Sequence, residues 1–552
     1  MPLTYQGGAT VAGITPCDLM TRLYAYAADS MGGREAGTPD AIRATAWIER
    51  EVRRLGLRPA GDNGTFYQDM PVSARIVTGT LIAGGKTFHL DVDFNAGGAI
   101  ADRQITADVV FGGMLGDTIN VLSADEVRGK IVLVAAPENG GNGSGGIDKA
   151  LAGASVIALV VQTISKPGVR FAMNDTVQSQ GRAAYAVANS TAAMGGRGGR
   201  AGMSSGGPLT MAVSPATAAA MLGKSVTSAV RGDTGGAAVI GVKVMDVAQP
   251  TRNVVAILDG SDPALQDEYL VIGAHSDHIG LASTVVEHDS LKAYNAVVRP
   301  QGLDMRPATP TAEQWARING IKDSLRRIYP ARRDSISNGA DDDGSGSVSI
   351  VEIAEAFAMG PVKPKRSLVF IWQTGEEKGL WGSQWFTNHP AIPRDAIVAE
   401  LNLDMVGRGA ASDVTGRDLD GHALLGAESY LQLVGSRRLS TELGDIVEQV
   451  NTREKMPFTF DYSMDANGHP QNIYCRSDHA NYARYGIPVV FFTTGGHADY
   501  HQVTDEPQYI QYDHMARVDQ LVFDIALAVG NLDHRVMVDR PKPDSPFARC
   551  QQ

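Results

Sequence analysis

The feature that most constrains the fold is a series of short apolar segments in the second half of the chain, alternating with segments of helical periodicity. The apolar segments are 253–258, 269–274, 368–372, 397–403 and 488–494. The helical segments are 347–358, 379–387, 436–450 and 514–531. Strands that are apolar throughout are buried on both faces, as in a parallel sheet covered by helices. The sequence therefore predicts an α/β domain with a mostly parallel sheet, helices on both faces, and a site at the carboxyl ends of the strands.

Ionisable residues stand directly after these predicted strands or ahead of a helix. They are His275, Asp277 and His278 after 269–274, Glu376 and Glu377 after 368–372, Asp404 after 397–403, His501 after 488–494, and Asp342 ahead of 347–358. Carboxylates that converge in one cleft repel one another unless a cation lies among them. Two histidines and three carboxylates suit Zn²⁺, and two ions that share one carboxylate form the usual hydrolytic pair. We therefore expect a two-metal centre, with one glutamate left over as a general base.

The rest of the chain divides by pattern. Residues 1–70 indicate N-terminal helices that pack on the catalytic domain, including an amphipathic helix that stops at Gly56. Residues 71–245 contain short β-rich segments separated by glycine clusters, which favours a separate small domain. The catalytic domain is expected over 246–535, and a C-terminal tail over 536–552.

Composition excludes several classes of function. The 552 residues carry a formal net charge of −12, so there is no uniform positive field to attract nucleic acid. No segment approaches the roughly 18 consecutive apolar residues that span a bilayer. The first residues lack the pattern of a signal peptide, so we expect either a cytosolic protein or a chain whose leader has been removed.

The three cysteines are Cys17, Cys475 and Cys550. Their odd number and the absence of a CxxC motif argue against a disulfide framework or a zinc ribbon. The sequence leaves the redox compartment open and predicts that Cys475 is a packing or lining residue.

Five motifs in order carry a resemblance to a known family. They are HSDH (275–278), NGADDDGSGS (338–347), TGEEKGLWGS (374–383), NLDMVGR (402–408) and YHQVTDEP (500–507). Together they resemble the two-zinc exopeptidase family that includes bacterial leucyl aminopeptidases and glutamate carboxypeptidase. The segment VRGKIVLVAAP is similar to the protease-associated domain that many members insert ahead of the catalytic sheet. The resemblance implies the zinc exopeptidase fold, and a periplasmic or secreted location.

The resemblance also implies a role for each site residue. His275 and Asp404 would hold one zinc, Glu377 and His501 the other, and Asp342 would bridge the two ions. Asp277 would accept the second ring N–H of His275, Glu376 would be the general base, and Tyr500 would donate a hydrogen bond to the developing oxyanion. Arg408 would contact substrate or pair with a carboxylate. Asp341 and Asp343 are read as bystanders, and His278, His479 and His497 as structural residues.

The expected function is zinc-dependent hydrolysis of short peptides, most simply as an aminopeptidase, with two Zn²⁺ or other divalent ions per chain. A carboxypeptidase, a dipeptidase or a single-zinc acyltransferase similar to glutaminyl cyclase would use a related centre. A non-catalytic binding module is a more remote alternative. A serine hydrolase is another, because Gly202–Gly206 satisfies the motif G-x-S-x-G, although within a Gly/Ser loop.

One departure from the family pattern is the long connection between His275 and Asp342, with an insertion over 280–337. Within it, Trp315, Ile318, Ile321, Leu325 and Ile328 recur at helical spacing, and Thr311 with Gln314 predicts a capping box. Nine Lys/Arg against six Asp/Glu make this segment locally positive. We expect a helical lid over the site that favours short peptides. Its positive charge fits either a solvated helix face or an attraction for a substrate carboxylate, and the first is the simpler interpretation.

Overall fold

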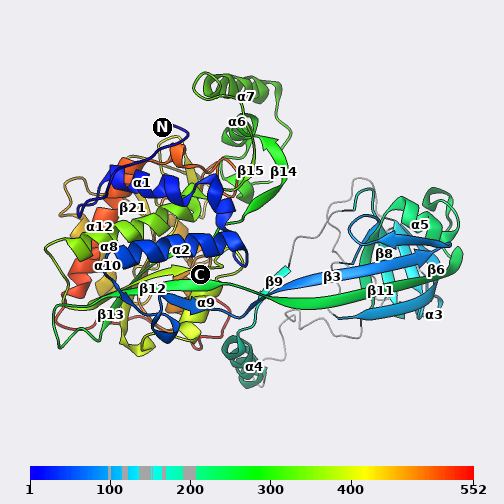
Figure 1. The fold of residues 1–552 in the computed structure, drawn as a ribbon, viewed down its shortest axis with the longest axis horizontal. Coiled ribbons are helices and arrows are strands. Elements are labelled where there is room, and N and C mark those ends of the chain that lie inside the picture. The colour runs from blue at the N-terminus through cyan, green and yellow to red at the C-terminus, as the bar shows by residue number, and fades with distance from the viewer. Residues whose placement is uncertain (97–100, 115–121, 136–150, 152, 165–169, 191–206) are drawn as a thin grey trace. The chain divides into compact units, whose positions relative to one another are not determined.

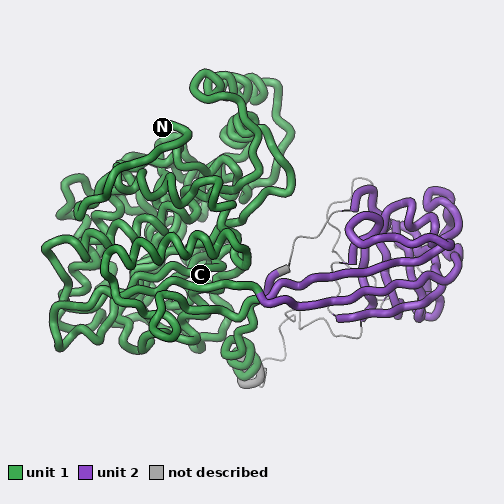
Figure 2. Tube along the Cα trace, in the orientation of Figure 1, with its two compact units in different colours: residues 1–72, 173–191, 249–552 green, residues 73–172, 192–248 purple. Residues whose placement is uncertain are grey.

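The computed structural model describes the chain except residues 97–100, 115–121, 136–150, 152, 165–169 and 191–206. The Gly202–Gly206 motif lies outside the described residues. The chain forms two compact units (Figure 2). The larger contains residues 1–72, 173–191 and 249–552, and the smaller contains 73–172 and 192–248.

The larger unit is built on one sheet with the strand order β1-β12-β16-β13-β17-β22-β20-β21, and β2 pairs with β12 (Figure 1). The neighbours β16, β13, β17 and β22 are parallel, whereas β12 and β20 join them antiparallel. The strands are β1 (Arg58–Pro59), β2 (Tyr67–Asp69), β12 (Arg252–Leu258), β13 (Tyr269–His275), β16 (Ser367–Gln373), β17 (Ile397–Leu403), β20 (Tyr430–Val434), β21 (Thr459–Asp461) and β22 (Val489–Thr493). The five predicted strands are confirmed, and the parallel centre is as expected.

Helices cover both faces of this sheet because the side chains of its strands are apolar on both sides. On one face, residues such as Ile272 and Phe370 pack against α1, α2, α8, α10 and α12. On the other, alternating residues such as Val271 and Ile371 pack against α9 and α11. The helices are α1 (Pro16–Tyr26), α2 (Pro39–Arg54), α4 (Thr176–Ser190), α8 (Gly346–Met359), α9 (Trp381–Asn388), α10 (Thr441–Asn451), α11 (His479–Ala483) and α12 (Tyr512–Gly530). Gly56, with φ +71°, follows α2 as predicted.

The insertion forms an arm on the larger unit. It contains β14 (Leu281–Glu287), α6 (His288–Val298), α7 (Ala312–Leu325) and β15 (Arg333–Ile336), with β14 and β15 antiparallel. The Thr311–Gln314 capping box is present, so the predicted helix and its start are confirmed. Within it, Ile318 is buried whereas Trp315 is 47% exposed. A second hairpin, β18 (Val414–Arg417) with β19 (Ala423–Leu425), was not predicted.

The smaller unit is a β-rich domain with its own apolar core. Its sheet has the order β4-β3-β11-β6-β7-β8-β10-β5, and β9 pairs with β3. Its strands and helices are β3 (Val72–Ala83), β4 (Lys86–His89), β5 (Phe94–Asn95), β6 (Arg103–Met114), α3 (Ala124–Val127), β7 (Ile131–Ala135), β8 (Val156–Val160), β9 (Arg170–Met173), β10 (Leu209–Val213), α5 (Pro215–Leu222) and β11 (Thr234–Gln249). Leu81, Leu133 and Ile240 are among the residues that fill its core.

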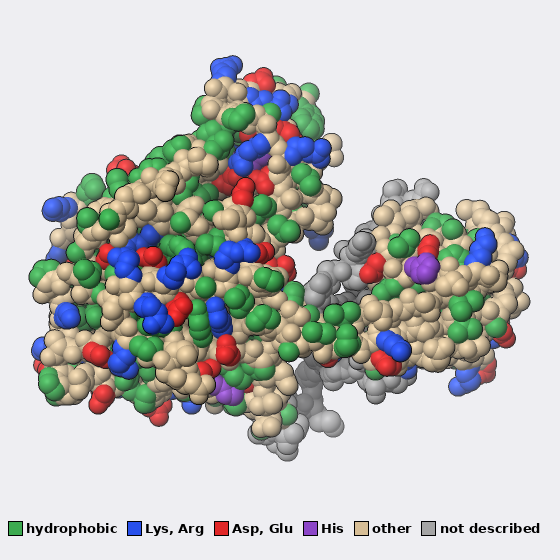
Figure 3. Space-filling model, viewed as in Figure 1, with side chains coloured by type: hydrophobic (Ala, Val, Ile, Leu, Met, Phe, Trp, Pro, Cys, Tyr) green, Lys and Arg blue, Asp and Glu red, His purple; other side chains and the backbone are tan. Residues whose placement is uncertain are grey.

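No helix within the described residues has the length and apolar content needed to cross a bilayer. On the visible face of the larger unit, acidic and basic side chains are interspersed (Figure 3). This mixed surface agrees with the prediction of a protein without a uniform positive field.

Candidate metal centre and pocket

The predicted site residues meet at the carboxyl edge of the parallel strands. His275 is the last residue of β13, Asp404 follows β17, and Glu376 and Glu377 follow β16. Asp342 lies in the turn Ala340–Ser345, immediately before α8. Parallel strands end on the same edge, so their first loop residues converge.

Asp342 lies between two histidines. Its Oδ1 is 3.1 Å from His275 Nε2, and its Oδ2 is 3.0 Å from His501 Nε2. On the first side, Asp404 Oδ1 is 3.7 Å from the same His275 nitrogen. On the second, Glu377 Oε2 is 3.0 Å from His501 Nε2. The structure therefore brings together all five predicted ligands in two groups that share Asp342.

The donor set fits divalent cations. Within each group the potential ligand atoms lie within 4.8 Å of one another. Several of these atoms are buried and, within the described part of the chain, make no hydrogen bond, namely His275 Nε2, Asp342 Oδ2 and Glu377 Oε1. Buried polar atoms without partners are costly, and a bound cation would compensate them. Imidazole nitrogens combined with carboxylate oxygens are the ligands that Zn²⁺ prefers.

The pKa values reflect the same crowding of charge. Burial opposes a charged imidazole, but the adjacent Asp342 and Glu377 carboxylates raise the pKa of His501 to about 11. Burial raises the pKa of Glu376 well above its usual range, and the nearby Glu377 and Asp404 carboxylates add to this effect. The carboxylates that raise these pKa values would also attract a divalent cation, and protons would compete with it for His501.

His278 is closer to the centre than the sequence analysis predicted. Its Nδ1 is 2.8 Å from Glu377 Oε1 and 3.7 Å from Asp342 Oδ2, and it belongs to the second group of potential ligands. The motif HSDH places His278 three positions after His275, and this spacing could have indicated its contact with Glu377. His278 is therefore a further candidate ligand, or a partner that orients Glu377.

The contacts of Asp277 correct one predicted detail. His275 Nδ1 is 3.0 Å from the backbone oxygen of Asp277, whereas the Asp277 carboxylate is 3.8 Å away, too far for a hydrogen bond. That carboxylate instead accepts the backbone N–H groups of Gly375 and Glu376, at 2.7 and 3.1 Å. Asp277 therefore fixes the loop that carries Glu376, because the backbone amides there need a buried acceptor.

Asp341 and Asp343 belong to neither group of potential ligands, as predicted, but both support the loops around the centre. Both are fully buried. Asp341 accepts the backbone N–H of Gly407 at 2.7 Å, and Asp343 accepts those of His275 and Gly346 at 3.1 and 2.8 Å. An acidic run is usually solvated, but here its carboxylates satisfy backbone donors of the loops around the centre. His497 and His479 are structural as predicted: His497 Nε2 lies 3.1 Å from Asp341, and His479 stacks on Phe491.

A pocket opens beside the two groups. Glu376 and Tyr500 line it together with Asp342, Asp404 and His501. Further apolar walls come from Met405, Met464, Ile473 and Phe491. The Tyr500 ring stacks on the His501 ring with centroids 4.0 Å apart. The structure thus places the predicted general base and the predicted hydroxyl donor in one cavity with the metal groups.

Arg408 does not line this pocket. Its guanidinium is buried, donating from Nη1 to Asp499 Oδ2 at 2.9 Å and lying 3.4 Å from Asp413 Oδ1. Of the two predicted roles, the structure shows pairing with carboxylates, and contact with substrate stays a prediction. A buried guanidinium requires such partners.

The predicted lid also needs correction. No residue of α7 is among those that line the pocket; α7 packs on α6 instead. The insertion reaches the pocket through the turn after α6, where Gln301 and Asp304 form part of the wall. Apolar spacing predicted the helix but carried no information about which neighbour it would cover.

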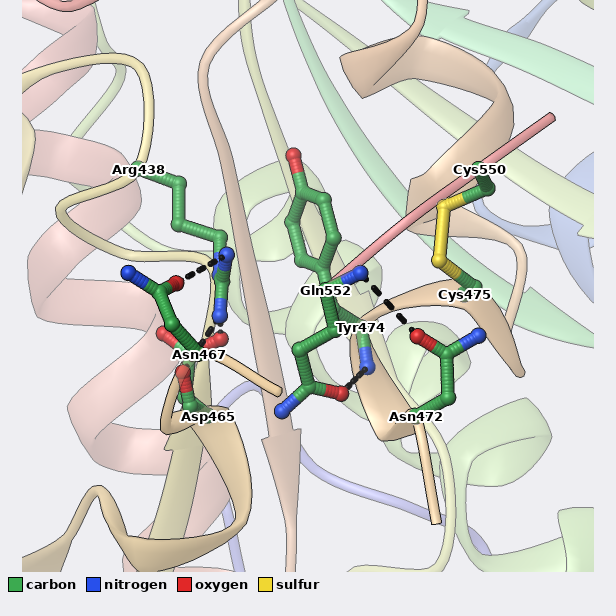
Figure 4. The surroundings of a disulfide bond; sticks show 8 residues. All are labelled: Arg438, Asp465, Asn467, Asn472, Tyr474, Cys475, Cys550 and Gln552. Atoms are coloured by element: carbon green, nitrogen blue, oxygen red, sulfur yellow. Dashed lines mark hydrogen bonds and ion pairs between the residues drawn. A yellow bond between two sulfur atoms is a disulfide. The ribbon is translucent and has the colours of Figure 1, made fainter. Parts of the chain in front are cut away.

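Cys475 and Cys550 form a disulfide, contrary to the prediction from the cysteine count (Figure 4). Beside it, Gln552 accepts the Tyr474 N–H through Oε1 and donates its own N–H to Asn472 Oδ1, both at 3.1 Å. Arg476, which follows Cys475 in the sequence, lines the pocket and was missed by the sequence analysis. The two cysteines are separated by 75 positions in the sequence, and nothing local indicates that they meet.

The structure combines a helix-covered α/β sheet with two His/carboxylate groups that share one aspartate at the strand ends. This combination defines a class of proteins that hold a pair of cations. Residues 253–526 match the sequence profile of Peptidase family M28. This match covers just under half of the chain, and over that region the chain is similar to the family.

Individual relatives are more distant. The chain is 40% identical over 77 residues to leupeptin-inactivating enzyme 1 of Streptomyces exfoliatus, covering 13% of this chain and 18% of that protein. It is 26% identical over 206 residues to leucine aminopeptidase 1 of Aspergillus fumigatus, covering 36% and 48%. The chain thus spans about half or less of the length of these relatives. Among solved structures, BSAP, a zinc aminopeptidase from Bacillus subtilis, aligns over 97% of this chain and 100% of that chain with 15% identity and a TM-score of 0.49.

Proposed function

We propose that this chain is an aminopeptidase that uses two Zn²⁺ ions to remove the N-terminal residue of short peptides. The observation that carries the proposal is the sharing of Asp342 by two His/carboxylate groups at the wall of a pocket that Glu376 also lines. The leucine aminopeptidases among its relatives support this choice over other peptidases.

Zn²⁺ bound in these groups would polarise the peptide carbonyl and make water a better nucleophile at neutral pH. His275, Asp342 and Asp404 would hold one ion, and Asp342, Glu377 and His501 the other. Glu376 takes a proton from the attacking water and returns it to the departing amine. Its raised pKa suits both steps, because the carboxylate must accept the proton from water and the resulting acid must release it to the amine.

Tyr500 supplies a neutral hydrogen-bond donor. Burial raises the pKa of its hydroxyl well above the usual value, and the nearby Asp342 and Glu377 carboxylates act in the same direction. The phenol therefore stays protonated and can donate to the negative charge that develops on the carbonyl oxygen. The apolar pocket wall suits an uncharged side chain of the N-terminal residue, which favours substrates with such residues.

A panel of peptides tests the proposal. Cleavage is expected for peptides with a free N-terminus, whether or not the C-terminus is amidated, and not for N-acetylated peptides. Activity should vanish with a chelator, return with Zn²⁺, and survive serine-directed inhibitors. Preference for N-acetylated peptides with a free carboxylate would identify a carboxypeptidase instead. A single zinc per chain, with cyclisation of N-terminal glutamine, would identify the acyltransferase alternative.

We also propose that the protein acts in the periplasm or outside the cell, and that residues 73–172 with 192–248 form a protease-associated domain. The Cys475–Cys550 disulfide supports the first proposal, because such bonds persist in oxidising compartments. The compact β-rich unit with its own core supports the second. Expression with export and without it, followed by thiol quantification, tests the location. Expression of the smaller unit alone tests whether it folds independently.

A further inference from the structure

The helix α6 of the insertion buries polar side chains. His288, Lys292 and Asn295 recur at i, i+4 and i+7, which places them on one helical face. His288 and Asn295 are fully buried, and the Lys292 side chain is 16% exposed. A helix usually turns an apolar stripe to its neighbours, so a buried polar stripe requires specific partners.

Each of the three residues has a polar partner in one short segment, 499–506. Lys292 Nζ donates to Asp499 Oδ2 at 2.6 Å, and Asn295 Nδ2 donates to Gln502 Oε1 at 3.2 Å. His288 Nε2 lies 2.9 Å from Glu506 Oε2. This segment also contains Tyr500 and His501, so α6 holds it at its beginning, middle and end.

The turn that follows α6 fixes the same segment through its backbone. Leu303 N–H donates to the Tyr500 carbonyl oxygen at 3.3 Å. Gly302 has φ +55°, and a Cβ there would lie 2.4 Å from that oxygen. This close approach therefore requires glycine.

His501 itself has a left-handed backbone, with φ +55°. Such a conformation is unfavourable for a residue with a side chain and persists only where the surroundings impose it. The contacts from α6 are such a constraint. Asp499 is held from the other side as well, because Arg408 Nη1 and Thr504 Oγ1 donate to it at 2.9 and 2.7 Å.

We propose that α6 is a clamp that sets the positions of the His501 imidazole and the Tyr500 hydroxyl, with Lys292 as its main positioning residue. The clamp acts mainly on the group that contains His501. His275 and Asp404 stand at the ends of β13 and β17, whereas His501 lies within the 499–506 segment. Apart from His501 itself, the link from this segment to the shared Asp342 runs through the Asp342 backbone N–H, which Asp505 accepts at 3.1 Å. The catalytic meaning of the clamp rests on the proposed function. Its effect on metal binding does not.

The test is a calorimetric Zn²⁺ titration of the metal-free full-length chain, with a competing chelator. Lys292→Met removes the charge and leaves Asp499 paired with Arg408. In the Lys292→Met variant, we expect the Zn²⁺ affinity of one site to be at least tenfold weaker and that of the other site to change less than twofold. Asn295→Ala, which unpairs no buried charge, should act in the same direction by about threefold. Lys322→Met, which removes the same charge from α7, is the control and should match the parent chain.

Active Lys292→Met protein should lose kcat with little change in KM, because the substrate does not touch Lys292. Three outcomes would each overturn the clamp. The affinity for both ions could fall equally, it could be unchanged for both ions in the Lys292 and Asn295 variants, or the parent chain could bind a single Zn²⁺. A parent chain that binds two Zn²⁺ but cleaves no peptide would overturn the proposed function alone, and the titration would still decide the clamp.

Discussion

Arg476 Nη2 donates a hydrogen bond to the Tyr500 hydroxyl oxygen, with a distance of 3.4 Å. An arginine has only donors, so this contact occupies an acceptor site of the phenol and leaves its O–H free to point into the pocket. Arg476 Nη1 is in turn 3.4 Å from Asp304 Oδ2, in the turn after α6. The insertion thus reaches the proposed oxyanion donor through one charged side chain.

A double-mutant cycle measures this coupling. Tyr500→Phe should lower kcat by at least about tenfold, because one hydrogen-bond donor to the oxyanion is lost. Arg476→Met should lower kcat by a smaller factor while Tyr500 is present, and by less than twofold in the Tyr500→Phe background. Arg317→Met, which removes a charge from α7, should leave kcat unchanged. Effects of Arg476 and Tyr500 that simply multiply would show that the two side chains act independently.

Glu376→Gln tests the general base. The amide keeps the shape of the side chain but cannot take up a proton at neutral pH, so kcat should fall by at least about a hundredfold. Both metal ions should remain bound in elemental analysis, because Glu376 belongs to neither group of potential ligands. The matched comparison is Glu377→Gln, which should lose metal from one site. Substantial turnover by metal-loaded Glu376→Gln protein would assign the base to another residue.

The sequence predicted the sheet and the position of the centre for one physical reason. Strands buried on both faces are apolar throughout, so the first ionisable residue after each strand stands out. His275, Asp404 and the pair Glu376–Glu377 were found in this way, and the family resemblance indicated Glu377 as the ligand of the two glutamates. The structure brings His275, Asp404 and Glu377 together with Asp342 and His501. The capping box of Thr311 and Gln314 was also predictable, because it depends only on residues three positions apart.

What the sequence did not predict depends on contacts between distant segments. The polar face of α6 escaped notice because helical periodicity was sought in apolar residues, whereas His288 and Asn295 are buried through hydrogen bonds and charge. Cys475 and Cys550 carry no local signal for their bond. The role of Asp277 depends on which backbone amides its loop presents, and Arg408 could be assigned only when Asp499 was located beside it.

The disulfide should matter for substrate binding as well as for stability. Cys475 adjoins Arg476, and Ile473 in the same segment lines the pocket. Cys550→Ser should raise KM several-fold with both metals bound, because the pocket wall loses its covalent link to the tail. It should also lower the free energy of unfolding by about 2–5 kcal/mol.

Peptidase kinetics and urea unfolding provide the two measurements. The control is Cys17→Ser, since Cys17 is an exposed free thiol and its loss should change neither value. If the Cys550 and Cys17 variants proved indistinguishable, the disulfide would have no role in holding the pocket.

Asp519 on α12 gives a stability prediction that is independent of the metal centre. Its side chain is fully buried, and its carboxylate oxygens make no hydrogen bond among the described residues. Burial raises its pKa to about 8, above the value of about 3.9 expected in the unfolded chain. The folded state therefore favours the protonated acid. Its stabilising contribution is complete below about pH 4 and is lost as the pH rises towards 8, by up to about 1.4 kcal/mol per pH unit.

Asp519→Asn removes this titration and keeps the shape of the side chain. Between pH 5 and 8 its free energy of unfolding, measured with urea, should fall less steeply than that of the parent chain, so that the variant is the more stable protein at pH 8. The control is Asp524→Asn on the same helix, where the carboxylate accepts a hydrogen bond from Gln520 at 2.8 Å. Parallel pH profiles for the parent chain and Asp519→Asn would mean that Asp519 is already ionised in the folded protein at pH 5, and that its burial is offset by a favourable interaction with the Arg22 charge.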